Sequence, residues 1–486
     1  MGYRYGNRIQ KTFLPCSIEE YVSDDAPVRA YNAFIDELDI EELGLVIDCC
    51  ERVGSPRYDP KAMLKLFIYG YSYGVRSSRK LEREVNYNLS FIWLMGGLKP
   101  DHKTIAEFRR NNIEVIKKTL KLCVRLCIKL DLIDGNILFV DGTKIYANAS
   151  KKRSHDKRYY EKRLVEIDER IEKILEESEV IDEREKQLGS LVKMSKEYRD
   201  SKRLKEKIEN ILKEFDKKPD YKEINETDTD AKIMRDKNKR FEAGYNVQAV
   251  TDDKHGLIVS VDVVSEGNDV KQFSRQIEKA NEILCRDCKV ACGDAGYANT
   301  ADIEKIDVKN IKVIVPSQRQ ALHAEAKPFN KQEFRYDKEK DCYYCPEGNI
   351  LRFDGRDKGK RHYLIRKAET CYECKDYGVC TKAKKGRKIV RLEKEVLREK
   401  IEAQYKEKES QEIYKRRKYR VEGVFGHIKE NLQARRFLLR GKTGVRVETF
   451  LLSTGFNIVK MIKILGGVVN FIRKVKVKIP RLAVIG

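Results

Sequence analysis

The charged segment from residue 151 to about residue 218 most constrains how this chain can fold. Its apolar residues recur with a 4-3-4-3 spacing at Tyr160, Leu164, Ile167, Ile171 and Ile174, and again at Leu204, Ile208, Ile211 and Phe215. This spacing is typical of a coiled-coil seam, so the two runs predict an antiparallel helical hairpin. The hairpin is either a solvated structural arm or a dimer contact.

Strand-like runs lie on both sides of the hairpin. Apolar runs predict strands at 137–140, 244–252, 256–265, 289–297 and 311–317, and a helix at 269–284. The resulting order is β, β, β, α, β, β, with the hairpin inserted after the first strand. We therefore expect an α/β fold, a mixed sheet flanked by helices.

Residues 1 to about 130 are predicted to be mainly helical. Pro60 opens one helix, Ser77 and Ser78 are candidate caps for a second, and Asp101 caps a third. Basic residues accompany these short helices: Arg76, Arg79, Lys103, Arg109 and Arg110. The pattern fits a helix-turn-helix type of DNA-binding domain, and it fits a plain helical bundle equally well.

Positive charge is concentrated at the C-terminal end. The formal net charge is +23 over 486 residues, and residues 381–486 hold 29 basic and 10 acidic side chains, a local charge of +19. An evenly spread charge would indicate only a soluble basic surface, whereas this concentration favours a polyanionic partner such as nucleic acid. The N-terminus lacks an apolar signal core and the patch 462–472 is too short to span a bilayer, so we expect a cytoplasmic protein without membrane contact.

Two apolar strands are each followed by a carboxylate. Asp141 follows Ile137 to Val140 and precedes Gly142, and Asp294 lies in the run KVACGDAGY. An aspartate before glycine commonly caps a turn, which is the alternative to a functional role. A third carboxylate, Glu422, lies on a predicted helix among Arg416, Arg417, Lys418 and Arg420, seven residues before Lys429. Glu422 either pairs with these cations or binds a metal beside groups that hold phosphates.

Three carboxylates from distant segments suit one kind of chemistry. Phosphodiester cleavage needs two divalent cations about 3.5–4 Å apart, one to activate the attacking oxygen and one to stabilise the leaving oxygen. Mg²⁺ is held by a few carboxylates together with water and phosphate oxygens. Asp141, Asp294 and Glu422 are therefore candidate ligands of two such ions.

Thirteen cysteines do not form a disulfide pattern, because many are isolated on apolar faces. Cys342 and Cys345 form one C-x-x-C pair, and Cys371 and Cys374 form a second. These pairs predict a structural Zn²⁺ site, in which Cys380 could replace one of the four ligands. The alternative is an ordinary polar insert at 329–388 whose cysteines stay reduced.

In its ordered motifs the chain resembles the DDE transposases of bacterial insertion sequences, over nearly its whole length. The matching stretches are YDPKAMLKLFIYGY, SSRKLE and PDHKTIAEFRR, then FVDGTKIYANAS, TDTDAKIM, GYNVQAV and GDAGY, the cysteine-bearing insert, VEGVFGHIK and RRFLLRG. The resemblance implies a ribonuclease H-like catalytic domain. It divides the chain into a helical DNA-binding domain (1–130), a first catalytic part (131–328) with the hairpin at 151–218, a zinc-ribbon-like insert (329–388) and a catalytic helix with a basic C-terminal region (389–486).

The resemblance also implies residue roles. Asp141, Asp294 and Glu422 would bind two Mg²⁺ or Mn²⁺ ions, and the implied DNA contacts are Lys429, Arg417, Lys418, Tyr414, Arg435 and Arg436. The implied partners are double-stranded DNA, as terminal inverted repeats and target, and a second copy of the chain. One feature departs from the family pattern of Tyr, two residues, Arg, three residues, Glu, six residues, Lys. Glu422 and Lys429 fit it, but Tyr414 and Arg417 each stand one residue early.

Two other functions would depend on some of the same residues. A metal-dependent nuclease of the same fold would use the same acids but would only hydrolyse DNA. A noncatalytic DNA-binding regulator would depend on the basic region and the cysteines, and would survive loss of all three acids.

Overall fold

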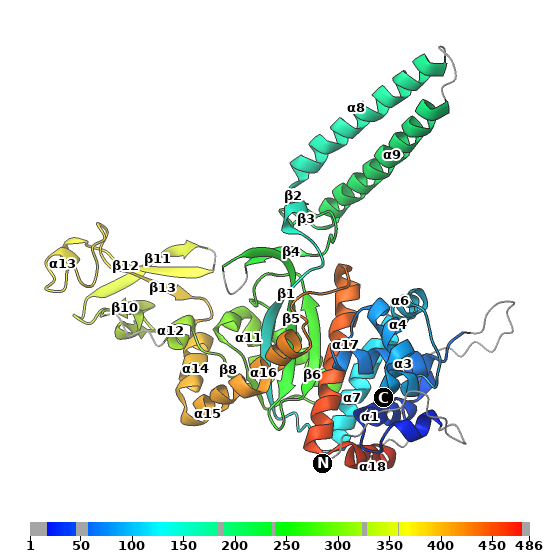
Figure 1. Cartoon of the computed structure of the whole chain (residues 1–486). Helices are drawn as coiled ribbons and strands as arrows, with labels where there is room; N and C mark the ends of the chain where they lie inside the picture. Colours follow the sequence, from blue (N-terminus) through cyan, green and yellow to red (C-terminus); the bar gives the residue numbers. More distant parts are fainter. Residues whose placement is uncertain are drawn as a thin grey trace, which may run out of the picture. The chain divides into compact units, whose positions relative to one another are not determined.

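The computed structural model describes residues 17–44, 57–182, 188–235, 239–322, 328–357 and 359–478. It is a mixed α/β structure with two compact units (Figure 1). The first unit comprises residues 1–269, 276–288 and 418–486, and the second comprises 270–275 and 289–417. Helix α10 (Phe273–Leu284) runs across a boundary between these ranges. The four-domain division expected from the sequence stays a prediction.

The N-terminal part of the first unit is helical, as predicted. Its elements are η1 (Ile18–Tyr21), α1 (Pro27–Asp36), α2 (Ile40–Leu43), α3 (Pro60–Ser72), α4 (Ser78–Tyr87), α5 (Leu89–Leu94), α6 (His102–Asn111) and α7 (Ile113–Lys129). The Asp59 side chain accepts hydrogen bonds from the first turn of α3, and Asp101 accepts one from Thr104 N at the start of α6. Ser77 is the N-cap of α4, but its side chain makes no capping hydrogen bond.

A long C-terminal helix, α17 (Gly441–Ile464), forms the centre of this unit. It packs against α3 and α7 and against strand β6, and most of its side chains from Val445 to Met461 are buried. A Cβ atom at Gly455 would collide with Ser72 of α3, so glycine at this position permits the close helix contact. The shorter α18 (Val468–Lys478) packs against α1.

Four strands of the first unit form an antiparallel arrangement. They are β1 (Ile137–Tyr146), β4 (Lys232–Arg235), β5 (Phe241–Asp252) and β6 (Ile258–Val264). The long central strand β5 pairs with each of the other three. The predicted hairpin of β5 and β6 is confirmed, whereas β1 continues six residues beyond Val140, where the sequence suggested that it ended. The continuation occurs because β5 offers a partner for every residue from Leu138 to Tyr146.

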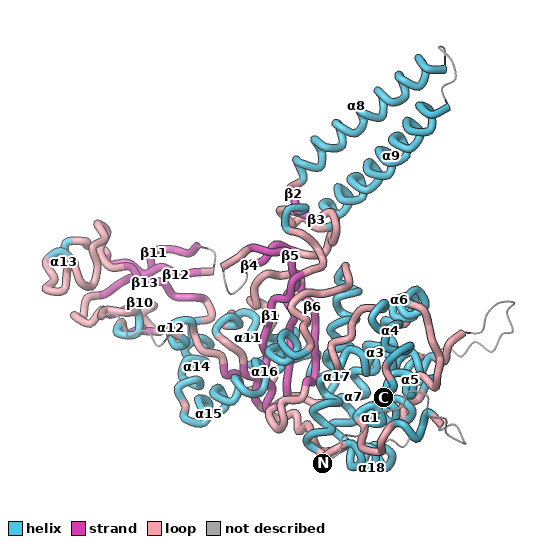
Figure 2. The backbone as a smooth tube through the Cα atoms, in the orientation of Figure 1, coloured by secondary structure: helices cyan, strands magenta, loops and turns pink. Residues whose placement is uncertain are grey.

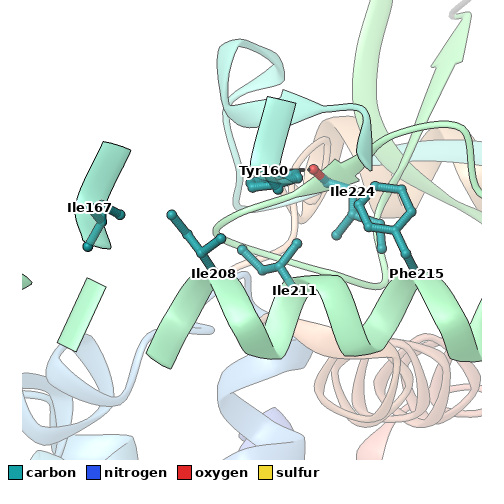
Figure 3. Packing of buried hydrophobic residues seen from close by; sticks show 6 residues of the cluster. All are labelled: Tyr160, Ile167, Ile208, Ile211, Phe215 and Ile224. Carbon is teal, nitrogen blue, oxygen red and sulfur yellow. Dashed lines mark hydrogen bonds between the residues drawn. The ribbon is translucent and has the colours of Figure 1, made fainter. Parts of the chain in front are cut away.

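The predicted helical hairpin is present as α8 (Lys157–Asp182) and α9 (Leu188–Lys217), which run side by side (Figure 1). Its base contains a small hydrophobic core of Tyr160, Ile167, Ile208, Ile211, Phe215 and Ile224 (Figure 3). Short strands β2 (Ser154–His155) and β3 (Ile224–Asn225) pair beneath it, after the turn η2 (Lys151–Arg153). The 4-3-4-3 positions therefore face one another as predicted.

The second unit contains a parallel strand pair, β7 (Val290–Cys292) and β8 (Lys312–Ile314). The turn η3 (Ala295–Tyr297) and helix α11 (Thr300–Asp307) connect these strands. Helices α14 (Glu395–Lys406) and α15 (Lys408–Arg417) pack against β8 and β7 respectively, and the short α12 (Gln318–Ala321) lies near η3. Both predicted strands are present, but β7 ends before Asp294.

The cysteine-bearing insert of the second unit folds around an antiparallel sheet (Figure 2). Its strands are β9 (Arg335–Asp337), β10 (Cys342–Tyr344), β11 (Ile350–Asp357), β12 (Lys360–Ile365) and β13 (Lys388–Leu392), paired in chain order. The turn η4 (Lys331–Glu333) precedes the sheet, and α13 (Glu369–Tyr372) lies between β12 and β13.

Among the described helices, none alone has the length and apolar character of a membrane span. One pair of helices, Gly441–Ile464 and Val468–Lys476, has the combined length and apolar composition of a membrane span, but the two are bent by 105° relative to each other.

The base of the α8–α9 hairpin gives a stability prediction. Tyr160 is fully buried and its hydroxyl donates to Ile224 O at 2.8 Å. Tyr160→Ala should lower the opening free energy of the hairpin by about 3–5 kcal/mol, and Tyr160→Phe by about 0.5–1.5 kcal/mol. Val165→Ala, at a position of α8 that is 57% exposed, should change it by less than about 0.5 kcal/mol. Native-state hydrogen exchange of the hairpin amides measures all three, and equal effects of Tyr160→Ala and Val165→Ala would contradict the packing.

Candidate functional site

Asp141 lies within strand β1, where it pairs with Ala249 of β5. No turn follows it, so the alternative that Asp141 caps a turn is wrong. Because side chains alternate across a strand, Asp141 and Thr143 share one face while Gly142 faces the other way. The strand therefore presents a partly exposed carboxylate with a threonine beside it.

The opposite face of β1 explains the glycine after Asp141. A Cβ atom at Gly142 would collide with Asp269 and Gln248. The Asp269 carboxylate accepts hydrogen bonds from Gln248 Nε2 at 2.6 Å and from Asn246 Nδ2 at 2.8 Å. This polar network backs the strand directly, so only glycine fits.

Glu422 and Lys429 lie on a helical segment of the same unit, as predicted, but the segment is not a regular α-helix. It consists of the π-helix η5 (Lys418–Glu422), the short α16 (Gly423–Gly426) and the π-helix η6 (His427–Asn431). A π-helix has one more residue in each hydrogen-bonded turn than an α-helix and is frequent at functional sites. The assumption that seven residues equal two α-helical turns is therefore wrong here.

A hydrogen bond links this helical segment to the strand of Asp141. Lys429 Nζ donates to Thr143 Oγ1 at 2.6 Å, and η5 packs against β1 and β5. The segment buries Phe425 and Ile428, while Glu422 is exposed. Two of the three predicted acids and the predicted lysine thus belong to one local structure.

The loop after the helical segment extends this structure along β1. Tyr146 N donates to Arg435 O at 3.1 Å, and Phe437 N donates to Tyr146 O at 2.9 Å. The Arg436 guanidinium donates to Ala147 O at 2.9 Å and lies over the Tyr146 ring. Arg435 is exposed and pairs with Glu430. Of the two predicted DNA contacts in this loop, Arg435 points to solvent while Arg436 also holds the fold together.

A buried ion pair fixes the same loop from the other side. Arg76, which follows α3, pairs with Glu448 of α17, and both side chains are almost completely buried. Arg76 also donates to Gln433 O at 2.8 Å and to Arg436 O at 3.1 Å, while Glu448 accepts from Leu438 N at 3.0 Å and from Leu439 N at 3.1 Å. Burial raises the pKa of Glu448, and the Arg76 charge opposes that rise. The ion pair joins the N-terminal helices to the loop beside β1.

Asp294 belongs to the second unit, at the end of the parallel strand β7. Its side chain accepts a hydrogen bond from Gly296 N at 2.8 Å and caps η3, a role that the sequence analysis considered only for Asp141. Phe273 and Tyr297 pack around Gly293, immediately before it.

Tyr414 and Arg417, on α15, lie in the neighbourhood of Asp294. Burial raises the pKa of Tyr414, the Arg417 charge opposes the rise, and the Asp294 charge adds to it. The Arg417 guanidinium stands 5.5 Å from the Tyr414 ring centroid, and Tyr405 contacts the same ring edge-on. The second unit thus groups three of the predicted site residues. Lys418, the next residue, is exposed at the start of η5.

The four predicted zinc ligands do not all lie around one pocket. Cys345, Cys371 and Cys374 line one pocket of the insert together with Cys380, whereas Cys342 is buried in β10 and is not among the residues lining it. Within the described ranges, no three His, Cys, Asp or Glu side chains form a ready metal-binding group.

Sequence reasoning missed four residues of this site: Thr143, Asp269, Arg76 and Glu448. Thr143 lies just beyond the predicted strand 137–140, and its position two residues after Asp141 was a usable signal. Asp269 and Glu448 lie far along the chain from their partners, and no local spacing points to them. Arg76 was noted as a basic residue of a DNA-binding module, but its side chain is buried.

Two family models match the chain. Residues 344–462 match a transposase DDE domain, and residues 16–111 match a transposase domain (DUF772). The first match contains Glu422 and Lys429, and Asp141 and Asp294 lie outside it. No curated protein matches the chain. A chain of the piggyBac transposase synaptic complex with hairpin DNA aligns over 94% of this chain and 83% of its own length, at 9% identity and a TM-score of 0.34.

Both matched segments are transposase domains, which defines the class of protein. The chain is a DDE-type transposase, a DNA transposase that depends on divalent metal ions.

The buried ion pair gives the second prediction. Arg76→Ala leaves the Glu448 carboxylate buried without its cation, and this should destabilise the first unit by about 3–5 kcal/mol. Arg435→Ala removes an exposed pair with Glu430 and should cost less than about 1 kcal/mol. Urea unfolding followed by the fluorescence of Trp93, the single tryptophan, compares the two variants within this unit. An Arg76→Ala midpoint no lower than that of Arg435→Ala would contradict the role of the pair.

Proposed function

We propose that this transposase binds the ends of a mobile DNA element and cuts and joins them through Asp141, Asp294 and Glu422. The main observation in support of the proposal is the hydrogen bond from Lys429 to Thr143. This bond links the helical segment that contains Glu422 to the strand that contains Asp141. A lysine between two carboxylate-bearing elements offsets their repulsion.

The order of strands supports a ribonuclease H-like catalytic domain. Antiparallel strands β1, β5 and β6 are followed by helix α10 and then by the parallel pair β7 and β8. Apart from the short strand β4, which precedes β5 and pairs with it, this is the order β, β, β, α, β, β expected of that fold. In the proposal, β1 supplies Asp141, the end of β7 supplies Asp294, and the helical segment after the insert supplies Glu422.

The donor set suits the divalent ions that a DDE domain uses. The proposed ligands are three carboxylates, and Asp141 and Glu422 are not buried, so each can reach an ion. Mg²⁺ or Mn²⁺ binds such oxygen ligands while keeping water and phosphate oxygens. When two ions are bound, they activate the attacking oxygen and stabilise the leaving one. The residues of the chain hold the ions and orient the DNA.

The π-helix at 418–422 accounts for the departure from the family pattern. Tyr414 and Arg417 stand one residue too early relative to Glu422, and η5 lies between them and ends at Glu422. A π-helical turn takes up one additional residue, so the insertion changes the winding rather than the direction in which the earlier side chains point. We therefore retain Tyr414 and Arg417 as site residues.

The proposed partner is double-stranded DNA, as element ends and as target. Lys429, Lys418, Arg417 and Arg435 are the proposed phosphate contacts, with Tyr414 beside them and Arg436 holding the loop. Two copies of the chain would each take one element end, and the protein would act as a homodimer in the cytoplasm. The concentration of positive charge in residues 381–486 supports contact with the DNA backbone.

Amide substitutions test the three acids. Asp141→Asn, Asp294→Asn and Glu422→Gln each remove a negative ligand at nearly constant size, so the protein should fold and bind DNA while Mg²⁺-dependent cleavage falls on the order of a thousandfold. The double variant Asp141→Asn with Asp294→Asn should lose about as much as either single variant, because the groups act as one unit.

A matched control is Glu412→Gln on α15, an exposed carboxylate paired with Lys415, which should keep normal cleavage. The assay follows cleavage and 3′-OH strand joining of a DNA end, with binding checked on the same preparations. Normal cleavage by Asp141→Asn or Glu422→Gln would exclude the catalytic assignment. Cleavage without joining by the unaltered protein would favour a nuclease.

Lys429 gives a prediction for DNA affinity. If Lys429 contacts a phosphate, Lys429→Ala should reduce the slope of log affinity against log salt by about one. Lys217→Ala removes an exposed lysine of the α8–α9 hairpin and should leave the slope unchanged. Fluorescence anisotropy with a labelled duplex at several salt concentrations measures the slope, and equal slopes for the two variants would refute the contact.

A further inference from the structure

The cysteine-rich insert has a small hydrophobic core. Its hydrophobic core comprises Phe334, Tyr343, Leu351, Tyr363, Ile365 and Ile389. Cys345, Cys371 and Cys380 pack at the edge of this core. Small domains with such limited cores commonly need disulfides or metal ions for stability. All of the insert cysteines are free thiols, which excludes disulfides among them.

Strand geometry separates Cys342 from the other thiols. Residues 342–344 form strand β10, paired with β9 on one side and β11 on the other. Side chains alternate along a strand, so positions 342 and 345, three residues apart, point to opposite faces. Tyr343 and Cys345 belong to the hydrophobic cluster and Cys342 does not. A C-x-x-C pair can chelate one ion only when a turn brings its thiols together, and here a strand holds them apart.

Four other thiols gather around one pocket. Cys345, Cys371, Cys374 and Cys380 all line it, together with Phe329 and Arg387. Cys345, Cys371 and Cys380 also pack against the same hydrophobic cluster, so these three thiols lie on one side of the insert.

Backbone turns on two sides already donate to the sulfur atoms. Asn349 N donates to Cys345 Sγ at 3.3 Å across a turn that contains Gly348, with φ +78°. Arg387 N donates to Cys371 Sγ at 3.4 Å. At Gly386, with φ +74°, a Cβ atom would lie 3.2 Å from the Cys371 sulfur. Backbone donors of this kind stabilise thiolates, and the glycine lets the backbone approach the sulfur closely.

We propose that Cys345, Cys371, Cys374 and Cys380 bind one structural Zn²⁺ ion, and that Cys342 is a buried residue that does not bind it. The chain supplies them as one cysteine after β10 and three in the pattern C-x₂-C-x₅-C. Zinc binds four thiolates tetrahedrally. The four thiols line one pocket but do not yet form a metal-binding group, so their side chains would have to change rotamer when the ion binds. Arg387 donates to Cys380 O at 2.8 Å and to Phe329 O at 2.6 Å, which holds its positive charge beside a centre of net charge about −2.

The ion would connect three segments of the insert. Cys345 follows β10, Cys371 lies on α13, and Cys380 lies in the loop before β13. Binding would release protons, because a coordinated thiol is deprotonated. The site is independent of the carboxylates that we assign to DNA cleavage.

Metal analysis of single variants tests the ligand set. Full-length protein without a histidine tag, purified without chelators, should contain about one zinc per chain. Cys342→Ser should keep that zinc, whereas Cys345→Ser, Cys371→Ser, Cys374→Ser and Cys380→Ser should each bind it at least about a hundredfold more weakly in competition with a chromogenic chelator. Retention by Cys380→Ser with loss from Cys342→Ser would overturn the assignment.

A spectroscopic measurement on the unaltered chain tests the zinc site even if one of the serine variants fails to fold. Protein grown with Co²⁺ in place of Zn²⁺ should show the visible and near-ultraviolet bands of tetrahedral cobalt bound by four thiolates. The Cys342→Ser protein should show the same spectrum. An unaltered chain that binds neither metal, or a cobalt spectrum without thiolate bands, would refute the site.

Discussion

The buried pair of Arg76 and Glu448 is the interaction on which the rest of the first unit depends. Its two charges are removed from water, so each requires the other and the hydrogen bonds around it. Those bonds go to the backbone of residues 433–439, the loop that runs beside the end of β1. The N-terminal helices and α17 therefore fix this loop before any DNA is bound. Arg76, which the sequence placed in a basic helical module, instead holds this loop in position.

Strand β1 is held by contacts at several points along its length. Its end, at Tyr146, bonds to the loop held by Arg76 and Glu448, and its middle, at Thr143, bonds to Lys429. The network of Asp269, Gln248 and Asn246 fills the other face at Gly142. Asp141 lies between these contacts, so its backbone position is determined from three directions. In the proposed function Asp141 shares metal ions with other carboxylates, and that role would require such positioning.

The sequence predicted the elements whose signals are local. The 4-3-4-3 spacing gave the helical hairpin, and the β-rich runs gave β5 and β6, because periodicity reports which side chains face a core. The length of β1 was underestimated, because Asp141 and Gly142 are poor strand residues and the pairing with β5 overrides their preferences. The ion pair of Arg76 with Glu448 spans 372 residues of the chain, and no local pattern encodes it. The π-helices were also missed. In the proposal, the one-residue offset of Tyr414 and Arg417 from the family pattern is the sequence feature that indicates the first of them.

Net charge was a reliable guide to the class of partner but a poor guide to individual contacts. Arg446 lies in the basic C-terminal region, yet its guanidinium pairs with the buried Asp262 at 3.0 Å. Lys460 donates to Gly256 O, and burial lowers the pKa of Lys460 to about 8. These cations contribute to the charge of +19 without facing solvent fully. The proposal therefore assigns DNA contact to particular exposed cations, such as Lys418 and Arg435, rather than to the net charge of the region.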